Sequence, residues 1–164
     1  MVKVKNKHRL KRKEIRELLD HIHRKIDADF SVSSENIETG TLDTYELIFI
    51  DGIPLFLRKD DDLFFTLVGL LRTKQTKRSV VVDMGAVRFV TNGADVMAPG
   101  IVDADSSIEP GDPVWVCDET HKKPLAVGKA LISGDEMKMK SSGKAVSMVH
   151  YIGDDLWTQT KQLL

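Results

Sequence analysis

Residues 91–101 read Thr-Asn-Gly-Ala-Asp-Val-Met-Ala-Pro-Gly-Ile, and this stretch predicts a short helical segment between two strands. Gly93 adopts a positive φ without steric conflict, and the pair Pro99 and Gly100 favours a sharp turn. Few side chains shield such a backbone, which suits close approach by a phosphate or by another polymer. A tight connection with no function of its own has the same pattern, so the flanking sequence has to decide.

The sequence that surrounds this stretch is rich in short strand-like runs. From residue 78 onward, turn-forming residues separate six of them, at 80–82, 87–90, 114–117, 125–132, 137–140 and 145–151. Many short strands are typical of a small barrel or sandwich. In the fifth run Met137 and Met139 alternate with Lys138 and Lys140, which predicts a strand with one apolar and one basic face. We expect this β-rich domain to cover residues 78–155, followed by a C-terminal tail at 156–164.

Residues 1–75 are expected to form a separate mixed α/β domain, joined to the second by a polar linker within 72–78. Its predicted helix falls within residues 7–26, where apolar side chains recur at helical spacing: Ile15, Leu18, Leu19, Ile22 and Ile26. Two β-rich runs at 45–50 and 53–57 flank Asp51-Gly52, a strong hairpin signal. Asp60, Asp61 and Asp62 precede an apolar run at 63–71. We interpret them as the cap of a second helix rather than as a metal site.

Charge is distributed unevenly along the chain. Residues 1–30 hold ten Lys and Arg against five Asp and Glu, whereas residues 31–77 and 78–164 each have a balance of −3. Arg9, Arg12 and Arg16 fall beside the apolar stripe of the first predicted helix. They are interpreted as an auxiliary basic ridge that contacts phosphate, with a merely solvated helix face as the alternative.

Composition favours a protein that folds in the cytoplasm. The chain has 164 residues, of which 41% are hydrophobic and 30% charged, as in ordinary globular proteins. Cys117 is the single cysteine and excludes an internal disulfide. No apolar run approaches the roughly 20 residues that span a bilayer, and the basic N-terminus lacks the apolar stretch of a signal peptide. We therefore expect a monomeric protein without a membrane partner.

Candidate catalytic and metal-binding residues are few. Cys117 and His121 have a spacing known from zinc sites, but a second ligand pair is missing, so no metal is expected. His150 lies near Asp154 and Asp155, and a structural hydrogen bond explains this better than an acid–base pair. Nucleotide-binding and hydrolase motifs are absent from the sequence. The sequence therefore predicts no enzyme and no cofactor.

The aromatic residues of the second half give weak support for base stacking. They are Phe89, Trp115, Tyr151 and Trp157. Core or inter-domain packing is the default interpretation for each of them.

Five short motifs follow one another in the second half, at 93–97, 99–101, 111–116, 126–130 and 143–146. They read GADVM, PGI, GDPVWV, AVGKA and GKAV, and in this order they resemble a PUA domain, the small RNA-binding pseudobarrel of pseudouridine synthases and archaeosine transglycosylases. The resemblance covers about residues 78–153. With the basic N-terminal helix and the ending HYIGDDLW at 150–157, the whole chain resembles archaeal relatives of the malignant T-cell-amplified sequence family. The N-terminal region of ligatin is built similarly.

This resemblance implies an α+β fold, in which an N-terminal mixed α/β domain precedes a C-terminal PUA β-pseudobarrel. It also implies non-catalytic binding of structured RNA, such as a tRNA acceptor end or small-subunit rRNA, in translation initiation or ribosome recycling. A ribosome or an initiation-factor-like protein is the implied partner. The RNA-binding residues that it implies, together with nearby cations, are Arg88, Thr91, Asn92, Gly93, Ala94, Asp95, Met97, Pro99, Gly100, Ile101, Gly128, Lys129, Ala130, Lys138, Lys140 and Lys144.

The residues themselves agree with part of this set. Backbone N–H groups near Gly93, Ala94 and Asp95, if they open a helix, are suited to hold a phosphate. Gly128 allows a backbone to come close, and Lys129 beside it supplies a charge. Two alternatives stay open: an accessory subunit that targets RNA to a tRNA-modifying enzyme of the archaeosine or pseudouridine type, and an adaptor that binds only proteins.

Overall fold

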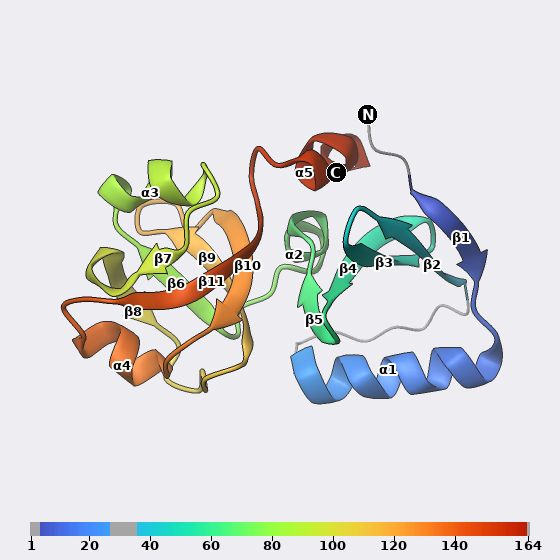
Figure 1. The fold of residues 1–164 in the computed structure, drawn as a ribbon, viewed down its shortest axis with the longest axis horizontal. Helices are drawn as coiled ribbons and strands as arrows, with labels where there is room; N and C mark the ends of the chain where they lie inside the picture. The colour runs from blue at the N-terminus through green and yellow to red at the C-terminus, as the bar shows by residue number, and fades with distance from the viewer. Residues whose placement is uncertain (1–3, 27–35, 164) are drawn as a thin grey trace.

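The computed structural model describes residues 4–26 and 36–163, which form two β-sheets that lie side by side along the long axis of the molecule (Figure 1). The first sheet has the strand order β1-β2-β3-β4-β5, and the second has the order β7-β11-β10-β9-β6-β8. The second sheet curls into a nearly closed barrel. The prediction of an α+β fold with an N-terminal mixed domain and a C-terminal pseudobarrel is confirmed.

The first sheet is antiparallel throughout and one helix covers it. Its elements are β1 Lys5–Arg9, α1 Arg12–Ile26, β2 Ile37–Leu42, β3 Tyr45–Ile50, β4 Ile53–Lys59 and β5 Asp62–Phe65. Leu18, Ile22 and Ile26 of α1 are buried in the core of this half. The predicted hairpin at Asp51-Gly52 is confirmed, with positive φ angles of 52° and 82°.

Two predictions for this half are wrong. Arg9 belongs to β1 and not to the helix, because the chain pairs with β2 before α1 begins at Arg12. Asp60 and Asp61 do not cap a helix either. They form the turn between β4 and β5 with φ angles of 51° and 67°. The helix α2, Leu67–Thr73, is capped by Thr66, whose Oγ1 accepts from the Gly69 N–H at 2.9 Å.

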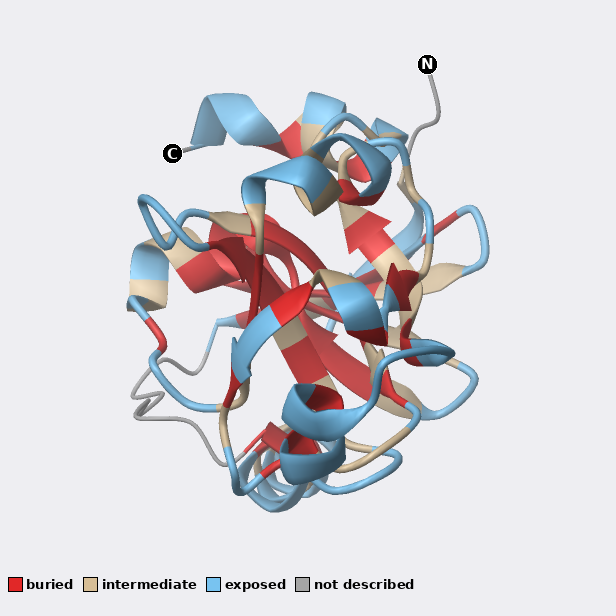
Figure 2. Cartoon of the chain, turned by 90° about the vertical axis from the view of Figure 1, so that its left-hand side faces the viewer, coloured by how far each residue is buried: buried red, intermediate tan, exposed pale blue. Residues whose placement is uncertain are grey.

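The second sheet is antiparallel except for the parallel pair β6 and β9. Figure 2 shows its strands buried beneath exposed helices. The elements of this half are β6 Ser79–Val82, α3 Met84–Val90, β7 Val96–Met97, the 3-10 turn η1 Ala98–Gly100, β8 Ile101–Ala104, β9 Pro113–Asp118, β10 Pro124–Ala130, α4 Gly134–Met139, β11 Lys144–Tyr151, α5 Asp155–Thr160 and η2 Lys161–Leu163.

Two predicted strands of this half are helices. Residues 87–90 belong to α3, and residues 137–140 overlap α4. Met137 is 1% exposed whereas Met139 is 82% exposed, so the two side chains do not share the face that an alternating strand would give them. Ser133 begins α4 by accepting a hydrogen bond from the Glu136 N–H. The turn chemistry at 133–135 is thus a helix cap.

The C-terminal residues 156–164, predicted as a tail, are helical as far as they are described. In Figure 1, α5 lies beside α2 of the first half, and a few contacts join the two helices. Leu156 is 2% exposed and belongs to the core that is built mainly by the first sheet. Trp157 packs against the same core, as predicted for it.

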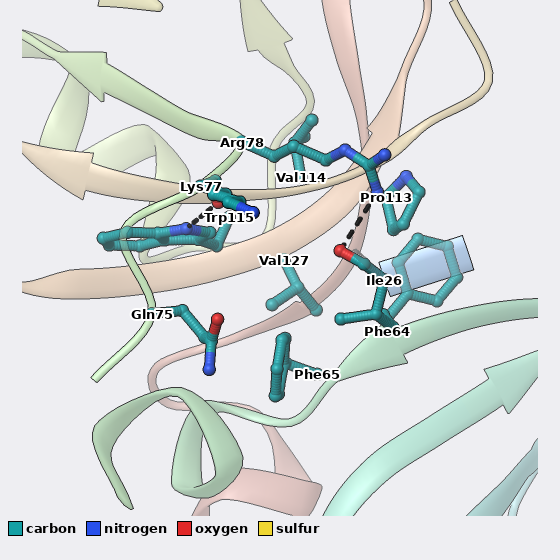
Figure 3. A pocket seen from close by; sticks show the side chains of 10 residues that line it. All are labelled: Ile26, Phe64, Phe65, Gln75, Lys77, Arg78, Pro113, Val114, Trp115 and Val127. Carbon is teal, nitrogen blue, oxygen red and sulfur yellow. Dashed lines mark hydrogen bonds between the residues drawn. The ribbon is translucent and has the colours of Figure 1, made fainter. Parts of the chain in front are cut away.

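Several direct contacts hold the two halves together. The Tyr45 hydroxyl donates to the Val149 carbonyl at 3.0 Å, and Arg78 Nη1 donates to the Lys25 carbonyl at 2.6 Å. Figure 3 shows the apolar junction, where Phe64 and Phe65 face Val127 from the second sheet. The cavity between these side chains measures about 20 Å³, which is too small for a nucleotide. These apolar side chains therefore form a packed contact between the halves.

His150 is a buried residue at this junction, and its two ring nitrogens form hydrogen bonds. Its Nδ1 lies 2.7 Å from Asp154 Oδ2, and its Nε2 accepts from the Leu67 N–H at 3.2 Å, which assigns the proton of the neutral ring to Nδ1. The side chain is fully buried. Burial acts to raise the pKa of Asp154, but hydrogen bonds from His150, Trp157 and Tyr151 outweigh it and hold that pKa below its usual value. Since both ring nitrogens are used and shielded from solvent, this pair is structural, as predicted.

Candidate nucleic-acid interface

The helix α3 forms the outer edge of the second half, at the end of the molecule far from the first sheet (Figure 1). Asp83 caps it, because its carboxylate accepts from the Ala86 N–H at 2.8 Å. Val90 faces the core at 2% exposure, while Met84 and Phe89 are 49% and 54% exposed. Phe89 lines an apolar groove beside this helix, and the groove is the reason to consider this surface as a candidate interface.

The turn after α3 closes that helix instead of opening a new one. The Gly93 N–H donates to the Val90 carbonyl at 3.0 Å, and the Ala94 N–H donates to the Phe89 carbonyl at 3.0 Å. Gly93 has a φ of 89°, as helix-terminating glycines do, and an added Cβ would meet the Tyr151 ring at 2.7 Å. The helix start predicted here is thus a helix end, and the Gly93 and Ala94 N–H groups are already used, so these two are not available to hold a phosphate.

Asp95 fixes this turn to the barrel. Its Oδ1 accepts from the Met148 N–H at 2.8 Å, and its Oδ2 lies 3.1 Å from Lys144 Nζ. The Met148 hydrogen bond and the Lys144 charge hold the pKa of Asp95 below its usual value. Asp95 therefore positions the turn and Lys144, and an acidic group in this place does not itself attract phosphate.

Between α3, the turn and η1 lies an apolar groove of about 610 Å³. Gly85, Ala86 and Gly100 leave the backbone of the groove uncovered, since they carry little or no side chain. Its walls and floor include the predicted residues Ala94, Asp95, Met97, Pro99, Gly100 and Lys144. We call this surface the α3 groove. The predicted Thr91, Asn92 and Gly93 belong to the turn beside it.

Aromatic and cationic side chains meet at the wall of the α3 groove. The Arg88 guanidinium carbon lies 5.0 Å from the centre of the Phe89 ring. Met97, 45% exposed, adds a flexible apolar surface. An exposed ring beside a bare backbone offers a nucleobase a stacking surface, and the two cations Arg88 and Lys144 flank it.

The lining residues that the sequence interpretation misses include Gly85, Ala86 and Phe89. Core or inter-domain packing is the default interpretation of Phe89, and 87–90 is predicted as a strand, whereas the structure places Phe89 on the exposed face of α3. The signal for a helix was present: Asp83 is a good N-cap, and Val87 and Val90 recur at a spacing of three. On a helix with that core face, Phe89 points outward.

A second group of predicted residues does not reach the α3 groove. Gly128, Ala130 and Ile101 are buried, Ala130 and Ile101 at 1% and 8% exposure. A Cβ on Gly128 would lie 2.4 Å from the Ser147 carbonyl oxygen of β11. Gly128 therefore allows close approach of a backbone, as predicted, but that backbone is the neighbouring strand rather than RNA.

Lys129 also lies elsewhere, at the junction. Its Nζ is 2.9 Å from Asp62 Oδ2 of the first half, with both side chains about two-fifths exposed. We expect Lys129→Met to leave tRNA affinity unchanged, and to lower the free energy of unfolding by no more than about 1 kcal/mol because the pair is exposed. Binding and urea titrations of the variant check this. A clear loss of tRNA affinity would contradict this prediction and show that Lys129 contacts the RNA.

The remaining predicted cations occupy two other surfaces. Lys138 lies on α4 and Lys140 directly follows that helix, and they pair with Asp135 at 3.6 Å and Glu136 at 3.4 Å. Arg12 and Arg16 are exposed on α1, and Arg9 is exposed on β1. Figure 1 shows α1 and α3 at opposite ends of the molecule, so these arginines do not extend the α3 groove.

Within residues 4–26 and 36–163, the side chains of His, Cys, Asp and Glu form no group of three that is suited to hold a metal ion. Burial raises the pKa of the Cys117 thiol to about 11, which leaves it protonated and unreactive at neutral pH. None of the described helices has both the length and the apolar character needed to cross a bilayer.

Comparison with protein families gives two matches that together cover most of the chain. Residues 78–152 match the PUA domain, and residues 6–73 match a domain of unknown function, DUF1947. The two matched segments meet at the loop between α2 and β6.

Known proteins resemble the chain over both segments. An uncharacterized protein of Methanocaldococcus jannaschii is 51% identical over 74% of this chain and 75% of its own length. Translation machinery-associated protein 20 of Saccharomyces cerevisiae is 31% identical over 70% of this chain and 67% of its own. Malignant T-cell-amplified sequence 1 of Danio rerio is 29% identical over 68% of this chain and 64% of its own.

Solved structures agree with the fold. A hypothetical protein from Pyrococcus horikoshii is 37% identical, has a TM-score of 0.79, and is matched over 94% of this chain and 99% of its own. A PUA domain protein from Aeropyrum pernix, solved as a tartrate complex, is 28% identical with a TM-score of 0.83, over 98% and 92%.

Proposed function

Because this chain belongs to the family of PUA-domain proteins that carry an N-terminal DUF1947 domain and are related to the malignant T-cell-amplified sequence and translation machinery-associated proteins, we propose that it is a non-catalytic RNA-binding protein of translation. It works in the cytoplasm on structured RNA, namely a tRNA acceptor end or small-subunit rRNA. The most specific support for this proposal comes from the α3 groove.

The α3 groove suits an unpaired end of RNA. Phe89 offers an exposed ring for stacking, and Gly85 and Ala86 let a nucleobase lie close to the backbone of α3. Sequence-specific recognition of RNA concentrates on unstacked bases rather than on paired ones, since side chains cannot read the deep, narrow major groove of A-form RNA. The groove is apolar, so stacking and shape supply most of the affinity there.

Few positive charges surround the α3 groove, so only a few RNA phosphates can be contacted there. Arg88 is exposed, and Lys144 is 61% exposed but shares its charge with Asp95. Residues 78–164 have a net charge of −3. A surface of this kind gives a shallow dependence on salt, about 0.7–0.9 in slope for each phosphate contact, and disfavours indiscriminate binding of polyanions.

The proposal predicts association with small ribosomal subunits that survives moderate salt, together with a specific shift of tRNA or of a small-subunit rRNA fragment. RNA crosslinked to the protein in cells and then sequenced identifies which of them it is. Poly(A) of similar length serves as the control and should bind far more weakly.

Two results contradict the proposal. Recovery with a nucleoside-modifying enzyme and without ribosomes favours the accessory-subunit alternative. Failure of both tRNA and rRNA fragments to bind at near-physiological salt excludes an RNA-binding role and favours the adaptor.

A further inference from the structure

A second groove lies in the first half of the molecule, between α1 and the sheet that this helix covers. It measures about 540 Å³ and is lined mostly by polar side chains. Figure 1 places α1 and α3 in different halves of the molecule, and the residues that line the two grooves are different, so this groove is separate from the α3 groove. We call it the α1 groove.

Arg58 of β4 forms part of the floor of the α1 groove and has unused donors. Its Nη1 lies 3.4 Å from Glu46 Oε1 on the neighbouring strand β3. Its Nε is shielded from solvent and has no hydrogen-bond partner within the described residues. A guanidinium carries five N–H donors in a fork that matches two oxygens of an oxyanion. The Arg58 side chain as a whole is 29% exposed, so an anion in the groove can be met by the accessible N–H groups of its guanidinium.

Three further cationic or titratable groups of α1 line the same groove. They are His21, Arg24 and Lys25. Burial lowers the pKa of His21, and the positive charges of Arg58, Arg24 and Lys25 lower it further, against a smaller opposite effect of Asp61. The region around His21 is therefore positively charged, although Glu46 offsets part of the Arg58 charge.

The remaining ionisable groups of the α1 groove lie toward the start of α1. Glu14 and Glu17 are on that helix, and His8 is on β1. Glu14 already accepts a hydrogen bond from the Lys11 N–H at 3.0 Å. The groove thus has one acidic end and one basic end, and only the basic end suits an anion.

We propose that the basic end of the α1 groove binds a phosphate-type oxyanion, with the Arg58 guanidinium as its main donor and His21, Arg24 and Lys25 around it. The oxyanion is either free phosphate or a phosphate of an RNA backbone, and the second source rests on the proposed function. This site needs no contribution from the α3 groove.

Sulfate, which does not titrate near neutral pH, is the first probe. NMR titration of the whole protein should shift resonances of α1 and β4, and Arg58→Gln should weaken sulfate binding by about tenfold, since a charge-assisted pair of hydrogen bonds is lost. Arg12→Gln, on the same helix but outside the groove, is the matched control and should bind like the natural protein. If Arg58→Gln fails to fold, Arg24→Gln takes its place and should weaken binding several-fold.

The dependence on pH gives an independent readout. A bound dianion favours the charged form of His21, so sulfate should raise the pKa of this histidine and bind more tightly as pH falls from 7.5 to 5.5. Absence of shifts in α1 and β4 at millimolar sulfate, or equal binding by Arg58→Gln and the natural protein, would overturn the proposal.

The source of the phosphate follows from competition. Release of sulfate from Arg58 by tRNA supports an RNA phosphate at the site, and displacement by inorganic phosphate but not by tRNA supports a free oxyanion. The Phe89 variant described below separates the two proposals, because it should lose RNA at the α3 groove and keep sulfate in the α1 groove.

Discussion

Phe89→Ala is expected to lower affinity for the RNA ligand about tenfold or more, because stacking of one base on an aromatic ring contributes about 1–3 kcal/mol. The ring is 54% exposed and contributes little to the core, so the melting temperature should stay close to that of the natural protein. Fluorescence anisotropy with labelled tRNA and thermal unfolding in the same buffer measure the two quantities.

Two further variants make this result specific to stacking. Phe89→Trp preserves an aromatic face and should retain most of the affinity, whereas Phe89→Leu should not. Met139→Ala removes an apolar side chain that is 82% exposed on α4 and should have no effect on binding. Equal affinity of Phe89→Ala and the natural protein would remove the α3 groove from the RNA interface.

His150→Ala is expected to lower the free energy of unfolding by about 3 kcal/mol or more. The substitution opens a cavity, leaves the Leu67 N–H without its acceptor, and takes from Asp154 its hydrogen bond at 2.7 Å. Urea unfolding at neutral pH gives the size of the effect. His121→Ala, at an exposed histidine in a turn, is the control and should change stability by less than about 0.5 kcal/mol.

The sign of the pH dependence identifies the source of this stability. The folded pKa of Asp154 lies below its unfolded value, so its contribution is present above about pH 4 and is lost as pH falls through the folded pKa. Without His150 that pKa rises toward the unfolded value. The difference in stability between His150→Ala and the natural protein should therefore become smaller in acid, and a constant difference would assign the whole effect to the cavity.

Local patterns in the sequence predicted the elements whose signals depend only on neighbouring residues. The hairpin at Asp51-Gly52 followed from the left-handed backbone that these two residues tolerate, and the apolar face of α1 from the spacing of Leu18, Ile22 and Ile26. The resemblance to a PUA domain predicted the barrel. These signals required no knowledge of which strands pair.

The errors arose where a short apolar run fits both a strand and a helix. Residues 63–65 form a strand because β4 is available to pair with them, and 87–90 form a helix because Asp83 caps it. The sequence does not reveal such tertiary pairings. For the same reason the ion pair of Lys129 could not be predicted, since Asp62 lies 67 residues away along the chain.

These errors also affected the prediction of the candidate site. The strand predicted at 87–90 is the helix α3, and the helix start predicted after it is a turn in which the Gly93 and Ala94 N–H groups are already used. Six residues that the PUA resemblance or a nearby positive charge suggested do line the α3 groove: Ala94, Asp95, Met97, Pro99, Gly100 and Lys144.

The hydrogen bonds of His150 and Arg78 join the two halves that carry the α3 and α1 grooves. Under the two proposals taken together, an RNA whose two contact points match the spacing of the grooves binds the second groove as an intramolecular event, at high effective concentration. An RNA with another spacing then gains affinity from one groove only. In that case the packed junction makes the dimensions of the RNA, beside its charge, a property that is selected.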